Sequence, residues 1–415
     1  MRVRCNAAWA FLVEITERKN IQNTAAESPA PTESSAEQHK QSLRRKDATK
    51  EKYSTMKTVK TLTLNGRVVP KEKTMLATGN AGHWGAVVGT GIVAFGLVFA
   101  AMITPFAASA APNATLLVSG LEELQGSAVG PSGALFVTAP LAGSIWRVDT
   151  RTGAVTLFTS GLPARIPGLD FIGSGVVDVA FIGGTAYALV TGVGPDLGGH
   201  DVVGIYRVDG PNSFSIVADI GAWSIAHPPA TGFFVPTGFQ YAIEPFRGGL
   251  LVTDGHHNRV LWVTRDGEIT ELIAFGNIVP TGLAVSGNSI YVAQAGPIPH
   301  LPEDGKVVVF GPKSTTATEV AAGARLAVDV EFGPGRTLFA LSQGFWDGPF
   351  EGTPALPNTG ALMRVNGDGT LTTVVGGLDR PTSVEIIKNT AYVVTLAGEI
   401  WKIDGVSCPP YGVSR

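Results

Sequence analysis

A pattern of apolar runs separated by glycine-rich turns recurs six times in the second part of the chain. The copies read "SIWRVDTRTGAVTLF" from 144, "GIYRVDGPNSFSIV" from 204, "RVLWVTRDGEITELI" from 259, "KVVVFGPKSTTATEV" from 306, "ALMRVNGDGTLTTVV" from 361 and "EIWKIDG" from 399. Their aligned positions are Trp146, Tyr206, Trp262, Val308, Met363 and Trp401. The intervals between these positions are 60, 56, 46, 55 and 38 residues. Because a period of about 50 residues is typical of a β-propeller blade, the repeat predicts a propeller of six blades.

Each repeat contains four short strands, named A to D in chain order. Strand B is "GALFVTA" at 133, "GGLLVTD" at 248 and "NTAYVVT" at 389, and strand A is clearest in "VPTGLAVSG" at 279 and "RPTSVEIIK" at 380. Glycine, at 52 residues, and proline, at 27, supply the turns, while charged residues make up only 16%. This composition favours short strands over helices.

The two ends of the repeat region predict a closed ring. The last copy stops after "WKIDGV" and lacks a D strand, whereas the region opens with "ATLLVSGLEELQG", which resembles the D strand and junction "LTTVVGGLDRPTS" at 371. We therefore expect the N-terminal strand to complete the sixth blade, so that no blade is left with three strands. The propeller is predicted to span residues 112–406, with a tail at 407–415.

The segment before the propeller has the composition of a targeting signal for export. Residues 1–84 are polar or basic and are predicted to be a disordered leader with a basic flank, and 85–111 form an uncharged apolar run that ends in small residues. This order predicts a signal peptide cleaved near Ala110 and Ala111. Retention as a membrane anchor is the alternative, with membrane contact only through residues 85–105. Either way we expect the propeller to be secreted, periplasmic or held at the cell surface.

Charge argues against a nucleic-acid partner. Of the 31 Lys and Arg and the 34 Asp and Glu, residues 1–75 hold 15 and 8, which leaves 16 basic and 26 acidic residues in the remainder. A surface that binds phosphates needs the opposite sign.

Strand parity places the long connections at one end of the propeller. The A–B and C–D turns are short, whereas the B–C and D–A connections hold long insertions and all five histidines of the region. Long loops on one face of a rigid scaffold commonly carry binding sites. We expect a small apolar molecule or a protein to bind there, and the candidate residues are His227, Phe234, Thr237, His256, His257, Thr281, Trp346, Asp347 and Thr382.

Two motifs carry a family resemblance. In "TDGHHNRVLWV" the residues Asp254, Asn258, Arg259 and Val260 stand where the NHL repeat has an Asp, a polar run, Arg and an aliphatic residue, and "PTG" resembles the usual opening of that repeat. The region from about 113 to 405 resembles the ScyD/ScyE family of secreted propellers, associated with the biosynthesis of an indole-derived pigment. The resemblance implies an NHL-like propeller and supplies no catalytic motif. It also explains His256 and His257 as part of a turn.

A metal-dependent enzyme is the alternative. Six-bladed lactonases of the SMP-30/gluconolactonase type hold a divalent cation through charged residues in strand A, but Gln125, Thr281 and Thr382 stand at the matching positions, and Thr237 repeats the substitution. No cofactor is therefore predicted, and a divalent cation is only a secondary expectation. The weak candidate ligands are Asp196, His200, Asp201, His300, Glu303 and Asp304. The pair His256 and His257 matches no zinc spacing.

Strand A also carries acids that face the expected channel. These are Asp178, Glu244, Asp329, Glu331 and Glu385. A buried acid can act as a general base, but solvation by channel water or pairing with Arg is the more common outcome. No Gly-x-Ser-x-Gly elbow occurs. The sequence thus favours a non-catalytic binding module over a metal-dependent hydrolase.

Overall fold

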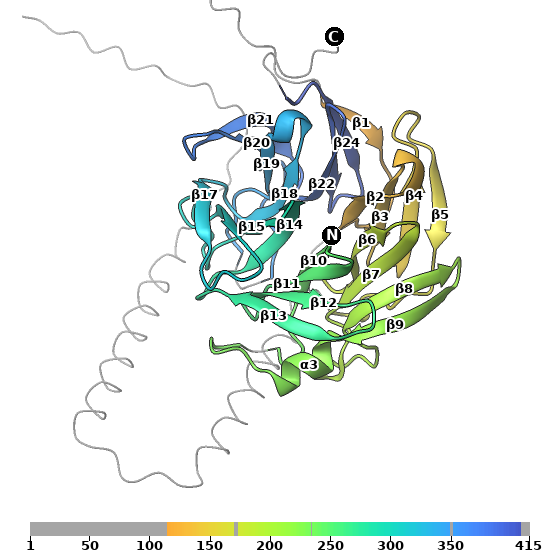
Figure 1. The fold of residues 1–415 in the computed structure, drawn as a ribbon. Helices are drawn as coiled ribbons and strands as arrows, with labels where there is room; N and C mark the ends of the chain where they lie inside the picture. Colours follow the sequence, from red (N-terminus) through yellow and green to blue (C-terminus); the bar gives the residue numbers. More distant parts are fainter. Residues whose placement is uncertain (1–113, 170–172, 234, 349–351, 408–415) are drawn as a thin grey trace, which may run out of the picture. The chain divides into compact units, whose positions relative to one another are not determined.

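A computed structural model describes residues 114–169, 173–233, 235–348 and 352–407. They form six four-stranded antiparallel sheets arranged in a ring (Figure 1). In every sheet the innermost strand is A, and strands B, C and D follow outward. The predicted all-β, six-bladed propeller is confirmed.

Blades 1 to 3 take strands A to D in chain order. Blade 1 contains β2 (Ser127–Val129), β3 (Leu135–Ala139), β4 (Ser144–Val148) and β5 (Val155–Thr159). Blade 2 contains β6 (Gly175–Ile182), β7 (Thr185–Thr191), β8 (Gly204–Gly210) and β9 (Ser213–Asp219). Blade 3 contains β10 (Gln240–Phe246), β11 (Gly249–Asp254), β12 (Arg259–Val263) and β13 (Ile269–Ala274). The helix α3 (Ile220–Ala226) lies between blades 2 and 3, and Asp219 caps it by accepting the N–H of Ala222.

Blades 4 and 5 repeat the order, and blade 6 borrows its outer strand. Blade 4 contains β14 (Pro280–Ser286), β15 (Ser289–Gln294), β16 (Lys306–Phe310) and β17 (Thr318–Ala322). Blade 5 contains β18 (Ala327–Phe332), β19 (Leu338–Ser342), β20 (Gly360–Val365) and β21 (Leu371–Leu378). Blade 6 contains β22 (Pro381–Ile387), β23 (Thr390–Thr395), β24 (Ile400–Asp404) and β1 (Ala114–Val118). Three 3-10 turns complete the described elements: η1 (Pro131–Gly133), η2 (Pro195–Leu197) and η3 (Pro334–Arg336).

The N-terminal strand closes the ring as the sequence predicts. β1 pairs antiparallel with β24, so that Ala114 lies opposite Ile403 and Leu116 opposite Trp401. The first and last blades are therefore held together by backbone hydrogen bonds, and blade 6 has the same four strands as the others.

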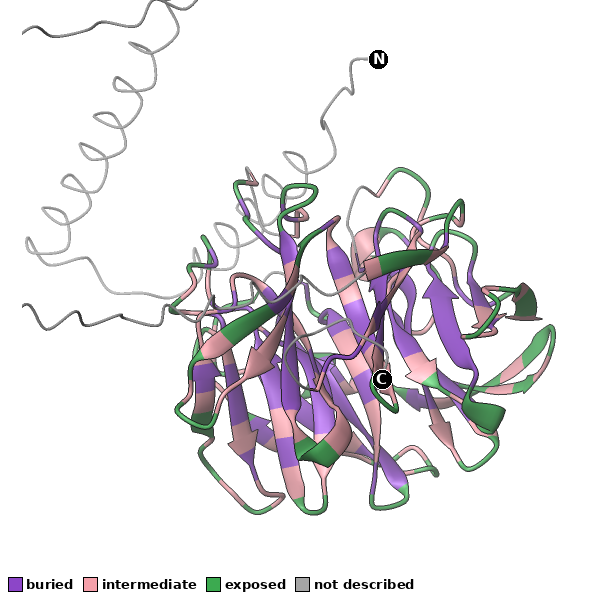
Figure 2. Ribbon diagram, turned by 90° about the horizontal axis from the view of Figure 1, so that it is seen from above, coloured by how far each residue is buried: buried purple, intermediate pink, exposed green. Residues whose placement is uncertain are grey.

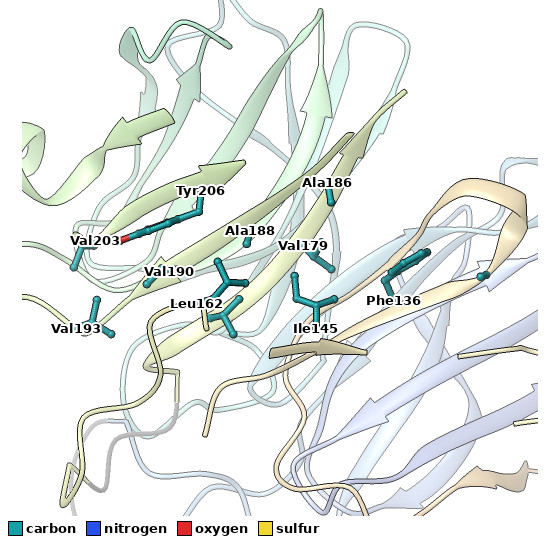
Figure 3. Packing of buried hydrophobic residues seen from close by; sticks show 12 residues of the cluster. Phe136, Ile145, Leu162, Val179, Ala186, Ala188, Val190, Val193, Val203 and Tyr206 are labelled. Carbon is teal, nitrogen blue, oxygen red and sulfur yellow. The ribbon is translucent and has the colours of Figure 1, made fainter. Parts of the chain in front are cut away.

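Packing between neighbouring blades supplies the core. Six clusters of buried apolar residues lie one at each blade-to-blade interface. At the interface of blades 1 and 2, Phe136 and Ile145 pack against Val179 and Ala188 (Figure 3). Each fully buried Val, Leu, Ile or Phe side chain stabilises the fold by about 1.5–3 kcal/mol. In Figure 2, buried residues follow the strands and exposed residues gather at the turns.

One repeat position differs from the alignment made on the sequence. Val260 pairs with Thr253, as Ile145 pairs with Thr138, so Leu261 and not Trp262 is equivalent to Trp146. The alignment matched the two indoles, but Trp262 lies one residue further along. Its Nε1 donates to the carbonyl oxygen of Phe246, 3.3 Å away. Aromatic identity was a poorer guide than backbone register.

The long connections lie at one end of the propeller, here called the loop face. It carries the β7–β8 connection (192–203), the β9–β10 connection (220–239), the β15–β16 connection (295–305) and the β19–β20 connection (343–359). At the other end most turns are short, such as 183–184 between β6 and β7. All five histidines of the propeller lie on the loop face, as expected from strand parity.

Several predictions concern residues outside the described part. These are the leader at 1–84, the signal or anchor at 85–111 with Ala110 and Ala111, and the tail beyond 407. Among the described residues, no helix is long and apolar enough to cross a membrane.

Candidate functional site

A cavity opens at the mouth of the central channel, on the loop face. Its volume is about 120 Å³, well above the ~10–15 Å³ that one water molecule needs by the same measure. The lining residues come from the first residues of strand A, the ends of strand B and the loops that follow. All six blades contribute, through Gln125, Asp178, Tyr241, His256, Thr281, His300, Asp329, Gln343 and Thr382 among others.

Two acids on opposite blades form part of the cavity wall. Asp178 of β6 accepts the N–H of Val179 on Oδ1 and that of Ile243 on Oδ2, at 2.8 and 2.9 Å. Asp329 of β18 repeats this geometry with Val330 and Val384, both at 2.8 Å. Each carboxyl group therefore joins strand A of its own blade to strand A of the next.

The preceding blade makes room for each acid. A Cβ built on Gly126 would lie 2.2 Å from Oδ1 of Asp178, and one on Gly282 would lie 2.3 Å from Oδ1 of Asp329. Only glycine leaves space for the carboxyl group at these positions. The unit of Gly, Asp and backbone N–H over three consecutive blades thus occurs twice in the ring.

Burial shifts the pKa of every acid on the inner strands. It raises the pKa of Asp178 well above its usual range and that of Asp329 to about 7. Deeper in the channel, burial and the neighbouring acids raise the pKa of Glu331 to about 8 and those of Glu244 and Glu385 well above the usual range. The three Glu side chains keep some solvent contact, but protein surrounds them on all sides of the narrow channel, so burial dominates.

His256 lines the cavity as a neutral ring. Burial lowers its pKa to about 4, against the weaker opposing effect of Asp254. Its ring centre lies 4.8 Å from that of Phe239 and 6.4 Å from that of Tyr241. The blade 3 wall of the cavity is therefore aromatic and uncharged at neutral pH.

The adjacent His257 belongs to a separate buried network. Its Nδ1 lies 3.0 Å from Oδ2 of Asp254, and the same oxygen accepts a hydrogen bond from Nε of Arg259 at 2.8 Å. Nε2 of His257 donates to the carbonyl oxygen of Val235, since a carbonyl can only accept. Asn258 closes the turn with a positive φ of 57°, a conformation that Asn tolerates. The turn and this network explain the motif "DGHHNR" without a metal.

His300 forms the blade 4 side of the cavity. It is buried, its Nδ1 lies 3.0 Å from the carbonyl oxygen of Ala295, and burial lowers its pKa. Its ring meets that of Trp346 edge-on at 5.3 Å. Nε1 of Trp346 donates to the carbonyl oxygen of Thr353 at 2.9 Å, which ties the β19–β20 connection together.

The structure divides the predicted ligand-face residues into two groups. His256, Thr281 and Thr382 line the cavity. His227 is exposed and stacks on Trp223 at 4.4 Å, and Trp346 supports His300 from behind. Asp347 is exposed, while His257 and Thr237 are buried away from the cavity lining. Phe234 lies outside the described residues.

The weak metal candidates fall on two separate loops. Asp196, His200 and Asp201 lie between β7 and β8, and His300, Glu303 and Asp304 lie between β15 and β16, two blades away. Within the described ranges, no group of three or more His, Cys, Asp or Glu is placed to hold a metal ion.

The positions matched to lactonase ligands do reach the cavity. Gln125, Thr281 and Thr382 all line it, but Tyr241 and not Thr237 holds the position in blade 3. Thr237 lies before β10, where its N–H and hydroxyl bond Oδ2 of Asp196 at 3.0 and 2.8 Å. The single hydroxyl proton of Thr281 lies between the carbonyl oxygens of Ala293 and Ala327, 3.1 and 2.9 Å from Oγ1, and the side chain carries no charge. This donor set does not fit a hard cation, which needs free and charged oxygen ligands.

Sequence reasoning missed several lining residues, notably Tyr241, Gln343 and Thr353. Tyr241 could have been found by aligning strand A on its register with strand B and not on the "PTG" motif. Gln343 directly follows β19, where the repeat places cavity residues in other blades, and its Oε1 accepts the N–H of Ala355 at 3.0 Å. No local pattern marks Thr353, which the long β19–β20 connection brings back to the cavity.

No protein-family model matches the sequence, and no curated protein matches it. Among solved structures, a gluconolactonase from Xanthomonas campestris is similar, with a TM-score of 0.50 and 12% identity over 70% of this chain and 89% of the other. An aldose sugar dehydrogenase from Streptomyces coelicolor, solved with bound PQQ, has a TM-score of 0.49 and 14% identity. The match covers 71% of this chain and 99% of the dehydrogenase. Virginiamycin B lyase from Staphylococcus aureus has a TM-score of 0.43 and 13% identity, and the match covers 70% of this chain and 98% of the lyase. At such identities the first likeness shows the fold alone, because propellers host many functions.

Proposed function

We propose that this chain is a non-catalytic binding protein that takes a small, mostly apolar molecule into the mouth of its central channel. The observation that carries the proposal is the cavity of about 120 Å³ to which all six blades contribute. Apolar side chains supply much of its wall, including Val279, Val328 and Leu396, and a few polar groups converge on it. Such a combination is usual for small-molecule sites.

The described site supports binding better than catalysis. Both oxygens of Asp178 and of Asp329 already accept backbone N–H groups, so these acids hold the inner strands together. The rings of His256 and Tyr241 offer flat apolar contact. A small-molecule ligand is favoured over a protein partner because the lining groups converge inside a cavity and not on an open surface.

The test is to block the cavity. In the full chain, Thr382→Phe fills part of the mouth, and we expect it to abolish binding of benzyl alcohol, an uncharged probe, measured by ligand-observed NMR and by thermal shift. Thr373→Phe is the matched control, because Thr373 is exposed on the outer strand β21. Binding that survives Thr382→Phe unchanged would rule out the channel mouth as the site.

A divalent-metal-dependent hydrolase is the second candidate. It is favoured by one observation, that two carboxyl groups, those of Asp178 and Asp329, line the cavity beside Gln125. The test is thermal shift with calcium, magnesium, zinc and EDTA. A large shift that is lost in Gln125→Ala would support a metal site at the cavity, and no shift would leave the binding function.

The setting proposed for this function is outside the cytoplasm, in a propeller of the ScyD/ScyE type. Support comes from the basic flank and apolar run up to residue 111 and from the motif around Asp254 and Arg259. The acidic balance of the propeller makes nucleic acid an unsuitable partner. N-terminal sequencing of the mature protein tests export, since a chain that starts at Met1 without processing and stays in the cytoplasm would contradict it.

A further inference from the structure

The inner strands of the propeller carry ionisable side chains of one kind only, carboxyl groups. The six A strands hold five acids and no Lys, Arg or His. The histidines of the cavity, His256 and His300, come from the loops, and burial lowers the pKa of both, so they are neutral at neutral pH. Within the described lining of the cavity, no protein cation balances Asp178 and Asp329.

The two acids retain the capacity to bind more than their backbone partners. A carboxylate has about four lone-pair positions; each group accepts one backbone N–H on each oxygen, and Asp329 also accepts a hydrogen bond from the Ser383 side chain. Asp178 is 7% exposed, so ionisation of its carboxyl group is costly unless a cation lies beside it. They stand in blades 2 and 5, on opposite sides of the six-membered ring, and contact the same cavity.

Other groups in the cavity also suit a ligand that carries a positive charge. Oε1 of Gln125 is buried and has no hydrogen-bond partner among the described residues. The rings of Tyr241 and His256 lie in the same wall, and the face of an aromatic ring attracts a cation. The described lining thus combines two carboxyl groups and an amide oxygen with aromatic ring faces, a set of groups that suits a cation.

We propose that the ligand of this cavity carries a single positive charge: an organic ammonium ion, with a compact apolar body, whose charged group lies between Asp178 and Asp329. An organic cation fits better than a metal ion, because in the described part of the chain no three acids or histidines are placed to coordinate one. The apolar body lies against Val279, Leu396 and the Tyr241 ring. This inference rests on the proposed binding function and adds the charge of the ligand.

Three probes of nearly the same shape test it. Benzylammonium, benzyl alcohol and benzoate share one ring and differ in charge, so the full chain can be titrated with each at pH 7.5 and followed by ligand-observed NMR. We expect benzylammonium to bind at least tenfold more tightly than benzyl alcohol, and benzoate not to bind. Equal or tighter binding of benzyl alcohol would overturn the charge inference and leave the proposed function intact. Failure of all three to bind would overturn the inference and count against the proposed function as well.

Substitutions of the two acids test whether their carboxyl groups cause the preference for a positively charged ligand. Asp329→Asn removes one charge at nearly constant shape, and we expect it to reduce the benzylammonium-to-benzyl alcohol affinity ratio at least threefold. Because both probes are measured on the same variant, a change in the amount of folded protein cancels from the ratio. Asp178→Asn is the second variant should Asp329→Asn fail to fold, and Asp368→Asn, in the turn after β20, is the control. A ratio unchanged in both channel variants would overturn the proposal.

Discussion

Buried acids lie in two regions of the propeller, and the two sets have different partners. Beneath the loop of blade 3, Asp254 is fully buried and contacts both Arg259 and His257. In the channel, Asp178 and Asp329 are bonded by backbone N–H groups, and no cationic side chain forms an ion pair with them among the described residues. A paired charge holds a loop in place, whereas an unpaired one leaves room for a ligand to supply the missing charge.

The largest expected effect comes from breaking the paired region. Arg259 is 1% exposed and also donates to the carbonyl oxygen of His227 and to Ser224 Oγ. Arg259→Met should lower the free energy of unfolding by about 3–5 kcal/mol, because Asp254 is then buried without a cation. Urea unfolding measures the change. Arg207→Met, which removes an exposed pair with Asp209, should change little, and an equal loss in both variants would contradict the comparison.

The second effect concerns the space reserved for a channel acid. Gly282→Ala places a methyl group against the Asp329 carboxyl and its Cα, at 2.3 and 2.4 Å, and should destabilise the fold by about 2–3 kcal/mol. Gly276→Ala is the control, because nothing lies within 4 Å of its Cβ position. Thermal unfolding compares the two. A neutral result at Gly282 would mean that the inner strands are not fixed by Asp329.

The third effect separates the regions by pH. Burial raises the pKa of Asp329 to about 7 and of Glu331 to about 8, so the folded state holds protons that the unfolded chain has released, and stability falls as pH rises from about 4 to about 8. His256 acts in the opposite sense between its folded pKa of about 4 and its usual value of 6.5. Between pH 6.5 and 8, the change in the free energy of unfolding therefore comes from the channel acids.

In that window the free energy of unfolding should decrease by roughly 1–3 kcal/mol. Urea midpoints at pH 6.5, 7, 7.5 and 8 measure the slope. A stability that rises over this window would show that the channel acids are already compensated.

The smallest effect tests one channel acid alone. Burial, together with the neighbouring acids, raises the pKa of Glu385, so Glu385→Gln should stabilise the fold by about 1 kcal/mol at pH 8 and have almost no effect at pH 5. Glu319→Gln on the outer strand β17 serves as the control, because Glu319 is exposed and pairs with the half-buried Lys306. The readout is the shift in melting temperature at both pH values. Equal effects at pH 5 and 8 would contradict repulsion within the channel.

Much of the architecture could be predicted from local pattern. The repeat of four strands, the closing strand at Ala114–Val118 and the loop face follow from period and parity, because strand alternation and antiparallel connection leave few other arrangements. The register of blade 3 could not be predicted. Trp262 has the same side chain as Trp146, but the backbone pairing makes Leu261 the residue equivalent to Trp146. Register is decided by packing on both faces of a strand.

The candidate site was predicted only in part. His256, Thr281 and Thr382, named from the sequence as ligand-face candidates, line the cavity, and the five acids expected to face the channel lie on the inner strands. Two neighbours in sequence, His256 and His257, nevertheless face different environments. A turn of four residues points one ring to the cavity and the other to Asp254, and the residue types alone do not distinguish them.

The sequence by itself determined the number of blades, the closure of the ring and the end at which long loops and histidines gather. Only the tertiary structure decided that Asp178 and Asp329, 151 positions apart, face one cavity with no cation among its described lining residues, while Asp254 has one. The physical reason is that strand periodicity is a local property of the chain. The neutralisation of a buried charge depends on groups brought together from different blades.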